Sequence, residues 1–195
     1  MSSLPSRIAI LGPTASGKSA LGAEVARRLG GIVVNGDPFQ AYEGLAIGTG
    51  QPTAEEQGEI GHVGYGLLPL SATLNPASFG AQVRAWMGEG PAVLVTGSGL
   101  YLRGIWEQLD VLPEVDEALV ARTRRWGQTM PGASLHRYLC AVDPLRAQQL
   151  HPKDRSRLQR ALALHLASGK RPSELLRGVE RGLPEGWKAL VVRPS

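Results

Sequence analysis

One stretch constrains the fold of this chain more than any other, because GPTASGKS at residues 12–19 lies between an apolar run and an amphipathic segment. The run at residues 7–11 reads RIAIL, which is typical of a buried strand. Across residues 16–29, apolar residues recur at helical spacing. The sequence therefore predicts a strand, a glycine-rich turn and a helix in direct succession.

Such a turn favours phosphate binding for several reasons that act together. Consecutive backbone N–H groups form a concave anion site, and the start of the helix adds the positive end of its dipole. Lys18 supplies a cation for the phosphates, and Ser19 supplies a hydroxyl that can coordinate Mg²⁺. We therefore predict a phosphate-binding site formed by Gly12, Pro13, Thr14, Ala15, Ser16, Gly17, Lys18 and Ser19.

Further apolar runs predict an α/β fold with a parallel sheet flanked by helices. Residues 31–35 and 91–97 are clear strand candidates, and residues 65–70 (YGLLPL) are a weaker one. A helical pattern at residues 76–87 lies between the strand candidates at residues 65–70 and 91–97. Because strands and helices alternate, each strand is expected to be parallel to its neighbours.

The pattern changes after this region. Residues 113–177 form arginine-rich helical patterns without a convincing strand, and an apolar run near the end predicts a returning strand. We therefore expect an α/β core at residues 1–112, an inserted helical lobe at residues 113–177, and a return to the core at residues 178–195.

Basic residues are concentrated in the second half of the chain. Residues 1–100 hold 5 Lys and Arg against 7 Asp and Glu, a net charge of −2, whereas residues 101–195 hold 16 against 10, a net charge of +6. This asymmetry is typical of nucleic-acid contact, and solvated helix faces are the alternative explanation.

Other features limit the class of protein. The single cysteine, Cys140, excludes an internal disulfide and a cysteine-based zinc cluster. No run approaches the roughly 18 apolar residues of a membrane span, and residues 7–11 are too short for the apolar part of a signal peptide. We expect a soluble cytoplasmic protein without membrane contact.

The position of one carboxylate distinguishes this chain from an ordinary nucleoside triphosphatase. Such enzymes usually hold Mg²⁺ with an Asp at the end of a second apolar strand, but no acidic residue follows the strand candidate at residues 91–97 directly. Asp37 instead follows residues 31–35, at the carboxyl end of a predicted strand. This placement favours a base that acts on a second substrate, and a turn or helix-capping aspartate is the alternative.

Four segments together resemble the tRNA dimethylallyltransferases: GPTASGKS, VNGDPFQAYEGLAIGTGQPT, VTGSGLYL and LHPKDRSRLQRALALHLASGK. The resemblance extends from about residue 7 to residue 176 and implies a P-loop NTPase-like sheet. It implies transfer of a dimethylallyl group from dimethylallyl diphosphate to the exocyclic amine of the adenine next to the tRNA anticodon. The diphosphate would then be a leaving group, with Mg²⁺ as cofactor and Ser19 as its ligand.

The resemblance also implies roles for individual residues. Asp37 would accept a proton from the adenine amine or orient it, and Ser98 would supply a hydroxyl near the diphosphate. Gln40 would hydrogen-bond the extruded adenine. The anticodon loop would contact two segments, which comprise Asp37, Pro38, Phe39 and Gln40 in the core and Ser156, Arg157, Leu158, Gln159 and Arg160 in the lobe.

Some positions depart from the family pattern. Pro38 replaces a residue that has an N–H, Gln51 stands in place of a lysine, and Val120 stands in place of an arginine. The family also continues beyond the point where this sequence stops. A fragment, a shortened enzyme and a decayed homologue are therefore all open, and uncovered apolar surface predicts self-association.

Three other functions stay open on the sequence. An adenine-nucleotide isopentenyltransferase would use the same donor with a free nucleotide. A P-loop small-molecule kinase would bind ATP and use Asp37 as a base toward a hydroxyl group. A nucleotide- or RNA-binding remnant would bind without turnover.

Overall fold

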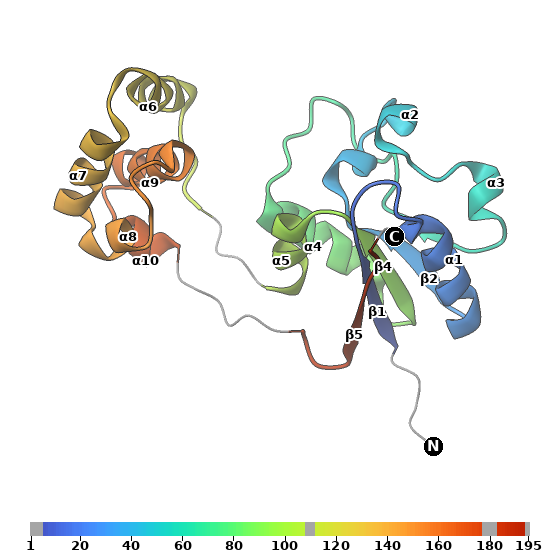
Figure 1. Cartoon of the computed structure of the whole chain (residues 1–195). Helices are drawn as coiled ribbons and strands as arrows, with labels where there is room; N and C mark the ends of the chain where they lie inside the picture. Colours follow the sequence, from blue (N-terminus) through green and yellow to red (C-terminus); the bar gives the residue numbers. More distant parts are fainter. Residues whose placement is uncertain (1–5, 108–111, 177–182, 194–195) are drawn as a thin grey trace. The chain divides into compact units, whose positions relative to one another are not determined.

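A five-stranded parallel sheet forms the centre of the first part of the chain, with the strand order β3-β2-β4-β1-β5 (Figure 1). The structure, a computed structural model, describes residues 6–107, 112–176 and 183–193. The strands are β1 (Arg7–Leu11), β2 (Ile32–Asn35), β3 (His62–Val63), β4 (Ala92–Thr96) and β5 (Trp187–Val191). Strand β4 is buried along its whole length, as expected for a sheet covered on both faces. The predicted α/β fold is confirmed.

Helices cover both faces of this sheet. On one face, α4 (Pro76–Met87) and α5 (Gly99–Trp106) pack against β1, β2 and β4 through a cluster that is centred on the fully buried Phe79. On the other face, α1 (Lys18–Leu29) packs Ala26 against Ile10, Val33 and Val93. Shorter elements connect β2 to β3, and these are η1 (Pro38–Ala41), α2 (Ala46–Thr49) and α3 (Ala54–Gln57).

The weak strand predicted at residues 65–70 is wrong. The strand of this region is β3, which is short and precedes the predicted segment, and Leu68 forms only an isolated bridge. Gly64 and Gly66 have φ angles of 89° and 58°, so the chain turns here and does not extend.

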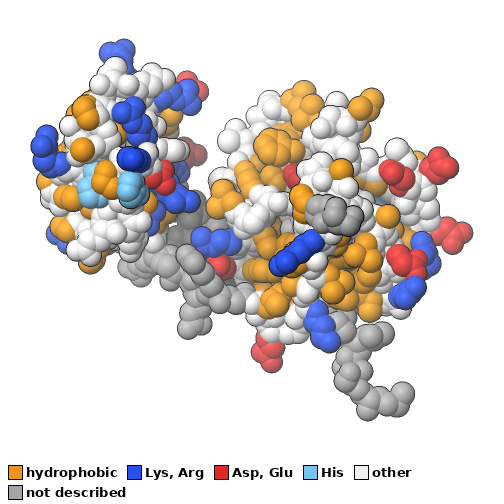
Figure 2. All heavy atoms as spheres, in the orientation of Figure 1, with side chains coloured by type: hydrophobic (Ala, Val, Ile, Leu, Met, Phe, Trp, Pro, Cys, Tyr) orange, Lys and Arg blue, Asp and Glu red, His pale blue; other side chains and the backbone are white. Residues whose placement is uncertain are grey.

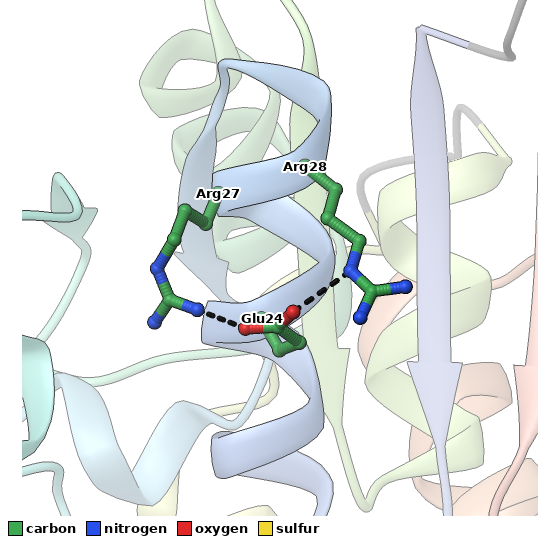
Figure 3. A network of polar contacts seen from close by, with 3 residues as sticks. All are labelled: Glu24, Arg27 and Arg28. Carbon is green, nitrogen blue, oxygen red and sulfur yellow. Dashed lines mark hydrogen bonds and ion pairs between the residues drawn. The ribbon is translucent and has the colours of Figure 1, made fainter.

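Helix α1 begins directly after the glycine-rich loop and ends at Gly30, whose φ of 63° is typical of a helix C-cap. Near its end, Glu24 forms ion pairs with Arg27 and Arg28, and the Arg28 pair measures 2.7 Å between Nε and Oε1 (Figure 3). The hydrogen bond from Arg28 lowers the pKa of Glu24. Because these side chains are largely in solvent, the pairs contribute little to stability.

Two glycines allow α4 and α5 to approach closely. A β-carbon added at Gly80 would lie 1.9 Å from the carbonyl oxygen of Gly104, and one added at Gly104 would lie 1.9 Å from that of Pro76. Arg84 of α4 donates to the carbonyl oxygens of Gly104 and Ile105, at 2.8 and 2.9 Å. The helix pair therefore depends on backbone contact that a larger residue would prevent.

The second part of the chain is helical. The chain divides into two compact units, one formed by Met1–Leu109 and Glu180–Ser195 and the other by Asp110–Val179. The helices of the second unit are α6 (Glu117–Thr129), α7 (Gly132–Val142), α8 (Pro144–Gln148), α9 (Arg155–Ser168) and α10 (Pro172–Leu175). Its core contains Leu135, Leu139, Leu158 and Leu162. The boundary predicted between residues 177 and 178 lies outside the described residues.

A buried carboxylate fixes the last helix of this unit. Asp143 is fully buried and caps α8 by accepting from the Arg146 N–H at 3.0 Å. It also accepts from the backbone N–H and hydroxyl of Ser173, at 2.6 and 2.9 Å, which holds α10 in place. Burial raises the pKa of Asp143, but the hydrogen bonds from Arg146 and Ser173 oppose this effect, and the pKa lies below its ordinary value.

No helix in the described parts of the chain is long and apolar enough to cross a membrane.

Replacement of Gly104 tests the close contact between α4 and α5. Although alanine is intrinsically the better helix former, Gly104→Ala should lower the free energy of unfolding by about 3 kcal/mol, because its methyl group would overlap the Pro76 carbonyl. Urea unfolding measures the change. Gly90→Ala is the matched control, since a β-carbon there meets no atom within 4 Å, and equal stability of the two variants would disprove the contact.

Candidate functional site: a cavity at the carboxyl edge of the sheet

The glycine-rich loop joins β1 to α1 with two residues in the left-handed conformation. Gly17 has a φ of 79°, and Ala15 has a φ of 61°, which is uncommon for a residue other than glycine. Lys18 begins α1, and its ammonium donates to the carbonyl oxygen of Pro13 at 2.5 Å. The lysine side chain therefore folds back over the loop that precedes it.

A cavity of about 410 Å³ lies beside this loop. It is bounded by the loop and the start of α1, the ends of β2 and β4, and the segments around α2 and α3. Its lining residues are Thr14, Ala15, Ser16, Gly17, Lys18, Ser19, Ala20, Asp37, Gln40, Thr49, Gly50, Glu56, Val95, Thr96 and Gly97. Six of the eight predicted phosphate-binding residues are therefore on its wall, together with Asp37 and Gln40.

Two groups of opposite charge lie near Gly97. The position of a β-carbon at Gly97 lies 4.0 Å from both the Oδ2 atom of Asp37 and the Nζ atom of Lys18. Burial lowers the pKa of Lys18, and the negative charge of Asp37 opposes this effect. A side chain at Gly97 would approach both the Lys18 ammonium and the Asp37 carboxylate.

The capping interpretation of Asp37 is confirmed, and the residue also lines the cavity. Its Oδ1 atom accepts from the N–H of Phe39 at 3.0 Å, so Asp37 caps η1. Its other oxygen, Oδ2, lies near Gly97 at the cavity. Pro38 is the first residue of η1, where a backbone N–H is not needed, which explains how proline is accommodated there.

The amide of Gln40 has a defined orientation. Its Nε2 atom donates to the carbonyl oxygens of Thr49 and Gly50, both at 2.9 Å. Because both partners are acceptors, the amide nitrogen must face them. Its carbonyl oxygen has no donor among the described residues and is available to accept a hydrogen bond from a ligand.

The environments of Ser98, Ser16 and Phe39 differ from one another. Ser98 precedes α5 without a side-chain cap and is not on the cavity wall, although its neighbour Gly97 is. The Oγ atom of Ser16 is buried without a hydrogen-bond partner. Phe39 is 65% exposed, which makes it the most exposed aromatic side chain among the described residues.

The predicted RNA-contacting residues of α9 divide between surface and core. Ser156, Arg157 and Arg160 are exposed, and Arg157 pairs with Asp154 at 3.1 Å. Leu158 is fully buried in the helical core, and Gln159 packs closely against Gly127. Side-chain contact with RNA is therefore available to the three exposed residues.

Positive charge is concentrated on this second unit. Residues 112–176 hold 11 Lys and Arg against 6 Asp and Glu. Figure 2 shows Lys and Arg side chains over the visible face of the helical unit. An excess of arginine of this kind suits a polyanion.

Sequence reasoning missed two residues at the cavity. Thr96 donates its hydroxyl to the carbonyl oxygen of Gly36 at 2.7 Å and accepts from the N–H of Ser98 at 3.1 Å, which links the ends of β2 and β4. Glu56 of α3 also lines the cavity. Only Thr96 had a signal in the sequence, since it lies near the carboxyl end of the strand predicted at residues 91–97.

The electrostatic coupling of Lys18 and Asp37 gives a testable pH dependence. Because the charge of Asp37 raises the pKa of Lys18, the change Asp37→Asn should lower that pKa further. An anion needs the ammonium form, so binding of inorganic diphosphate should be lost at a lower pH in the variant than in the wild type. Calorimetric titration from pH 7 to pH 10 measures this, with Glu89→Gln as the control. An unchanged or higher limit would contradict the coupling.

Family models match most of this chain. A model described as IPP transferase matches residues 40–192, and one described as isopentenyl transferase matches residues 6–62. Curated relatives named tRNA dimethylallyltransferase are also similar. One from Methylorubrum extorquens is 42% identical over 170 residues, covering 85% of this chain and 54% of the relative. That of Azorhizobium caulinodans is 36% identical, covering 95% of this chain and 61% of the relative.

Solved structures show the same fold. A crystal structure of a eukaryotic dimethylallyltransferase acting on tRNA matches with a TM-score of 0.74 at 23% identity, covering 95% of this chain and 48% of that chain. The tRNA isopentenylpyrophosphate transferase of Bacillus halodurans matches with a TM-score of 0.52 at 29% identity, covering 85% and 57%. These likenesses confirm the predicted P-loop NTPase-like fold class.

The chain spans about half the length of the curated relatives it matches. The match to the first family model nevertheless extends over well more than half of the chain, including the helical unit. The resemblance found in the sequence is confirmed, and the chain belongs to the IPP transferase family.

Proposed function

We propose that this protein transfers a dimethylallyl group from dimethylallyl diphosphate to the exocyclic amine of the adenine adjacent to the anticodon in tRNA. The observation that carries this proposal is the cavity that Lys18 and Asp37 both line, with the Lys18 ammonium and Oδ2 of Asp37 near Gly97. Curated relatives named tRNA dimethylallyltransferase support the transfer of a dimethylallyl group to tRNA. We propose a cytoplasmic location, where tRNA is modified.

The glycine-rich loop and Lys18 would bind the diphosphate. During transfer the allylic C–O bond breaks, a C–N bond forms to the adenine amine, and the electron pair of the broken bond remains on the diphosphate. Loop N–H groups, the start of α1 and the Lys18 ammonium stabilise this developing negative charge. The loop thus serves a leaving group, in contrast to its use for energy transfer in nucleoside triphosphatases.

Ser19 could supply one ligand to a magnesium ion whose other ligands are waters and substrate phosphates. Its hydroxyl lines the cavity at the second residue of α1, beside the region proposed for the diphosphate. Among the described residues no cluster of three His, Cys, Asp or Glu side chains could hold a metal. Mg²⁺ commonly keeps several waters and binds substrate phosphates, so one protein hydroxyl suffices, and the ion when bound would neutralise diphosphate charge.

Asp37 and Gln40 would serve the acceptor. The free carbonyl oxygen of Gln40 can accept one N–H of the adenine amine, and Oδ2 of Asp37 can accept the proton that the amine loses on alkylation. An adenine must leave its stack to reach this cavity. Ser98 is proposed to act near the diphosphate through its position next to Gly97.

The helical unit would hold the RNA. Its net positive charge and the exposed Ser156, Arg157 and Arg160 suit contact with phosphates of the anticodon stem-loop. In the core, the exposed Phe39 and its neighbour Pro38 are proposed to contact the same RNA.

Transfer of a labelled dimethylallyl group to unmodified tRNA tests the proposal. Lys18→Ala should abolish both diphosphate binding and transfer. Asp37→Ala should lower transfer at least about 100-fold while diphosphate affinity stays within a few-fold, because it removes only proton acceptance. Glu89→Ala, an exposed acidic residue between α4 and β4, is the matched control.

Parallel acceptors separate the alternatives. Label on AMP and not on tRNA would indicate an adenine-nucleotide isopentenyltransferase, and phosphate transfer from ATP to a hydroxyl compound would indicate a kinase. Diphosphate binding without any transfer would indicate a binding remnant. Each of these three results would contradict the proposed reaction.

A further inference from the structure

Asn35 is a fully buried polar residue at the end of β2, two residues before Asp37. Its Oδ1 atom accepts from the N–H of Asp37 at 2.8 Å. Its Nδ2 atom donates to the carbonyl oxygen of Asp37 at 2.9 Å and to that of Gly64 at 2.8 Å. One side chain therefore holds both backbone polar groups of the residue that carries the cavity carboxylate.

The other backbone groups of this turn are also fixed. The N–H of Gly36 donates to the carbonyl oxygen of Val95 at 2.9 Å, and the carbonyl oxygen of Gly36 accepts from the Thr96 hydroxyl at 2.7 Å. With Asn35 in place, every N–H and C=O of residues 36 and 37 has a partner. Because Oδ1 of Asp37 is engaged with η1, the direction of Oδ2 depends on this backbone.

The bond to Gly64 connects this turn to a neighbouring segment. Gly64 has a φ of 89°, and a β-carbon there would lie 2.7 Å from the Trp86 ring, so the position suits glycine alone. The adjacent Tyr65 is close enough to Asp37 for the two to interact electrostatically. Burial raises the pKa of Tyr65, and the charge of Asp37 raises it further, so a neutral phenol lies near the carboxylate.

The three bonds require an amide. The site presents one N–H donor and two carbonyl acceptors, and only an asparagine-sized amide offers an acceptor and a two-proton donor at once. An aspartate would place an oxygen against two carbonyl oxygens. An alanine would leave the Asp37 N–H and the Gly64 carbonyl without these partners, and the Asp37 carbonyl would keep only the Gln40 N–H at 3.1 Å.

We propose that Asn35 is a positioning residue that aims the Asp37 carboxylate at the acceptor amine. This inference rests on the proposed function of Asp37 as the proton acceptor. Asn35 itself does not line the cavity, so it acts through Asp37 alone.

Steady-state transfer by the Asn35→Ala and Asn35→Asp variants of the full chain tests this proposal. Each should lower kcat roughly 10- to 100-fold, because misplacement of a reacting group by about 1 Å can lower the rate by about 100-fold. The Kd for inorganic diphosphate, measured by calorimetry, should stay within about threefold, since the loop is unchanged.

The decisive comparison is the double variant. If Asn35 acts only through Asp37, adding Asn35→Ala to Asp37→Ala should change the residual rate less than about twofold. A single variant with wild-type kcat, or a further large loss in the double variant, would overturn the proposal. Asn75→Ala is the stability control, because Asn75 also holds backbone N–H groups, at the start of α4, and its loss should leave kcat unchanged.

Amide hydrogen exchange gives a readout that does not need activity. The N–H of Asp37 should be protected in the wild type and should exchange at least about tenfold faster in Asn35→Ala, with Asn75→Ala unchanged. Equal exchange in both variants would overturn the proposal. A wild type that transfers nothing would overturn the proposed function instead, and the exchange of the Asp37 amide would then decide whether Asn35 fixes this residue.

Discussion

Parallel pairing of β2, β4 and β1 is the interaction on which the rest of the site depends. The register places Leu11 opposite Thr96 and Asn35 opposite Val95, so three strands end at the same edge of the sheet. The glycine-rich loop, the turn before Asp37 and the turn at Gly97 begin at that edge. A parallel sheet brings such turns together regardless of their distance in sequence, which is why residues from three segments share one cavity.

The charges of Lys18 and Asp37 in this cavity fit the group transfer that we propose. Lys18 is partly buried, which lowers its pKa, and the nearby carboxylate of Asp37 opposes that effect. Gly97 lies near both groups and adds no side chain there. A bound diphosphate would satisfy the cation, while Asp37 would remain available for a proton because its second oxygen has no backbone partner. In the proposed reaction, Lys18 would therefore bind the diphosphate and Asp37 would accept the proton within the same cavity.

The sequence predicted the elements that local pattern controls. The loop, β1, β4 and the position of Asp37 follow from apolar runs and glycine spacing, and the structure agrees. The strand predicted at residues 65–70 failed because left-handed glycines redirect the chain there. Asn35 and Thr96 were missed because their importance lies in hydrogen bonds to turns that become neighbours only after the strands pair. Leu158, which the family resemblance assigned to RNA contact, is fully buried because it lies on the apolar face of α9.

In the proposed reaction, the loop holds a diphosphate that departs intact when a carbon–nitrogen bond forms. Phosphorus-31 NMR of the reaction with dimethylallyl diphosphate and unmodified tRNA measures this directly. One inorganic diphosphate should appear for each dimethylallyl group on tRNA, with no orthophosphate. Release of orthophosphate in step with turnover, or turnover that requires ATP and yields ADP, would contradict the claim.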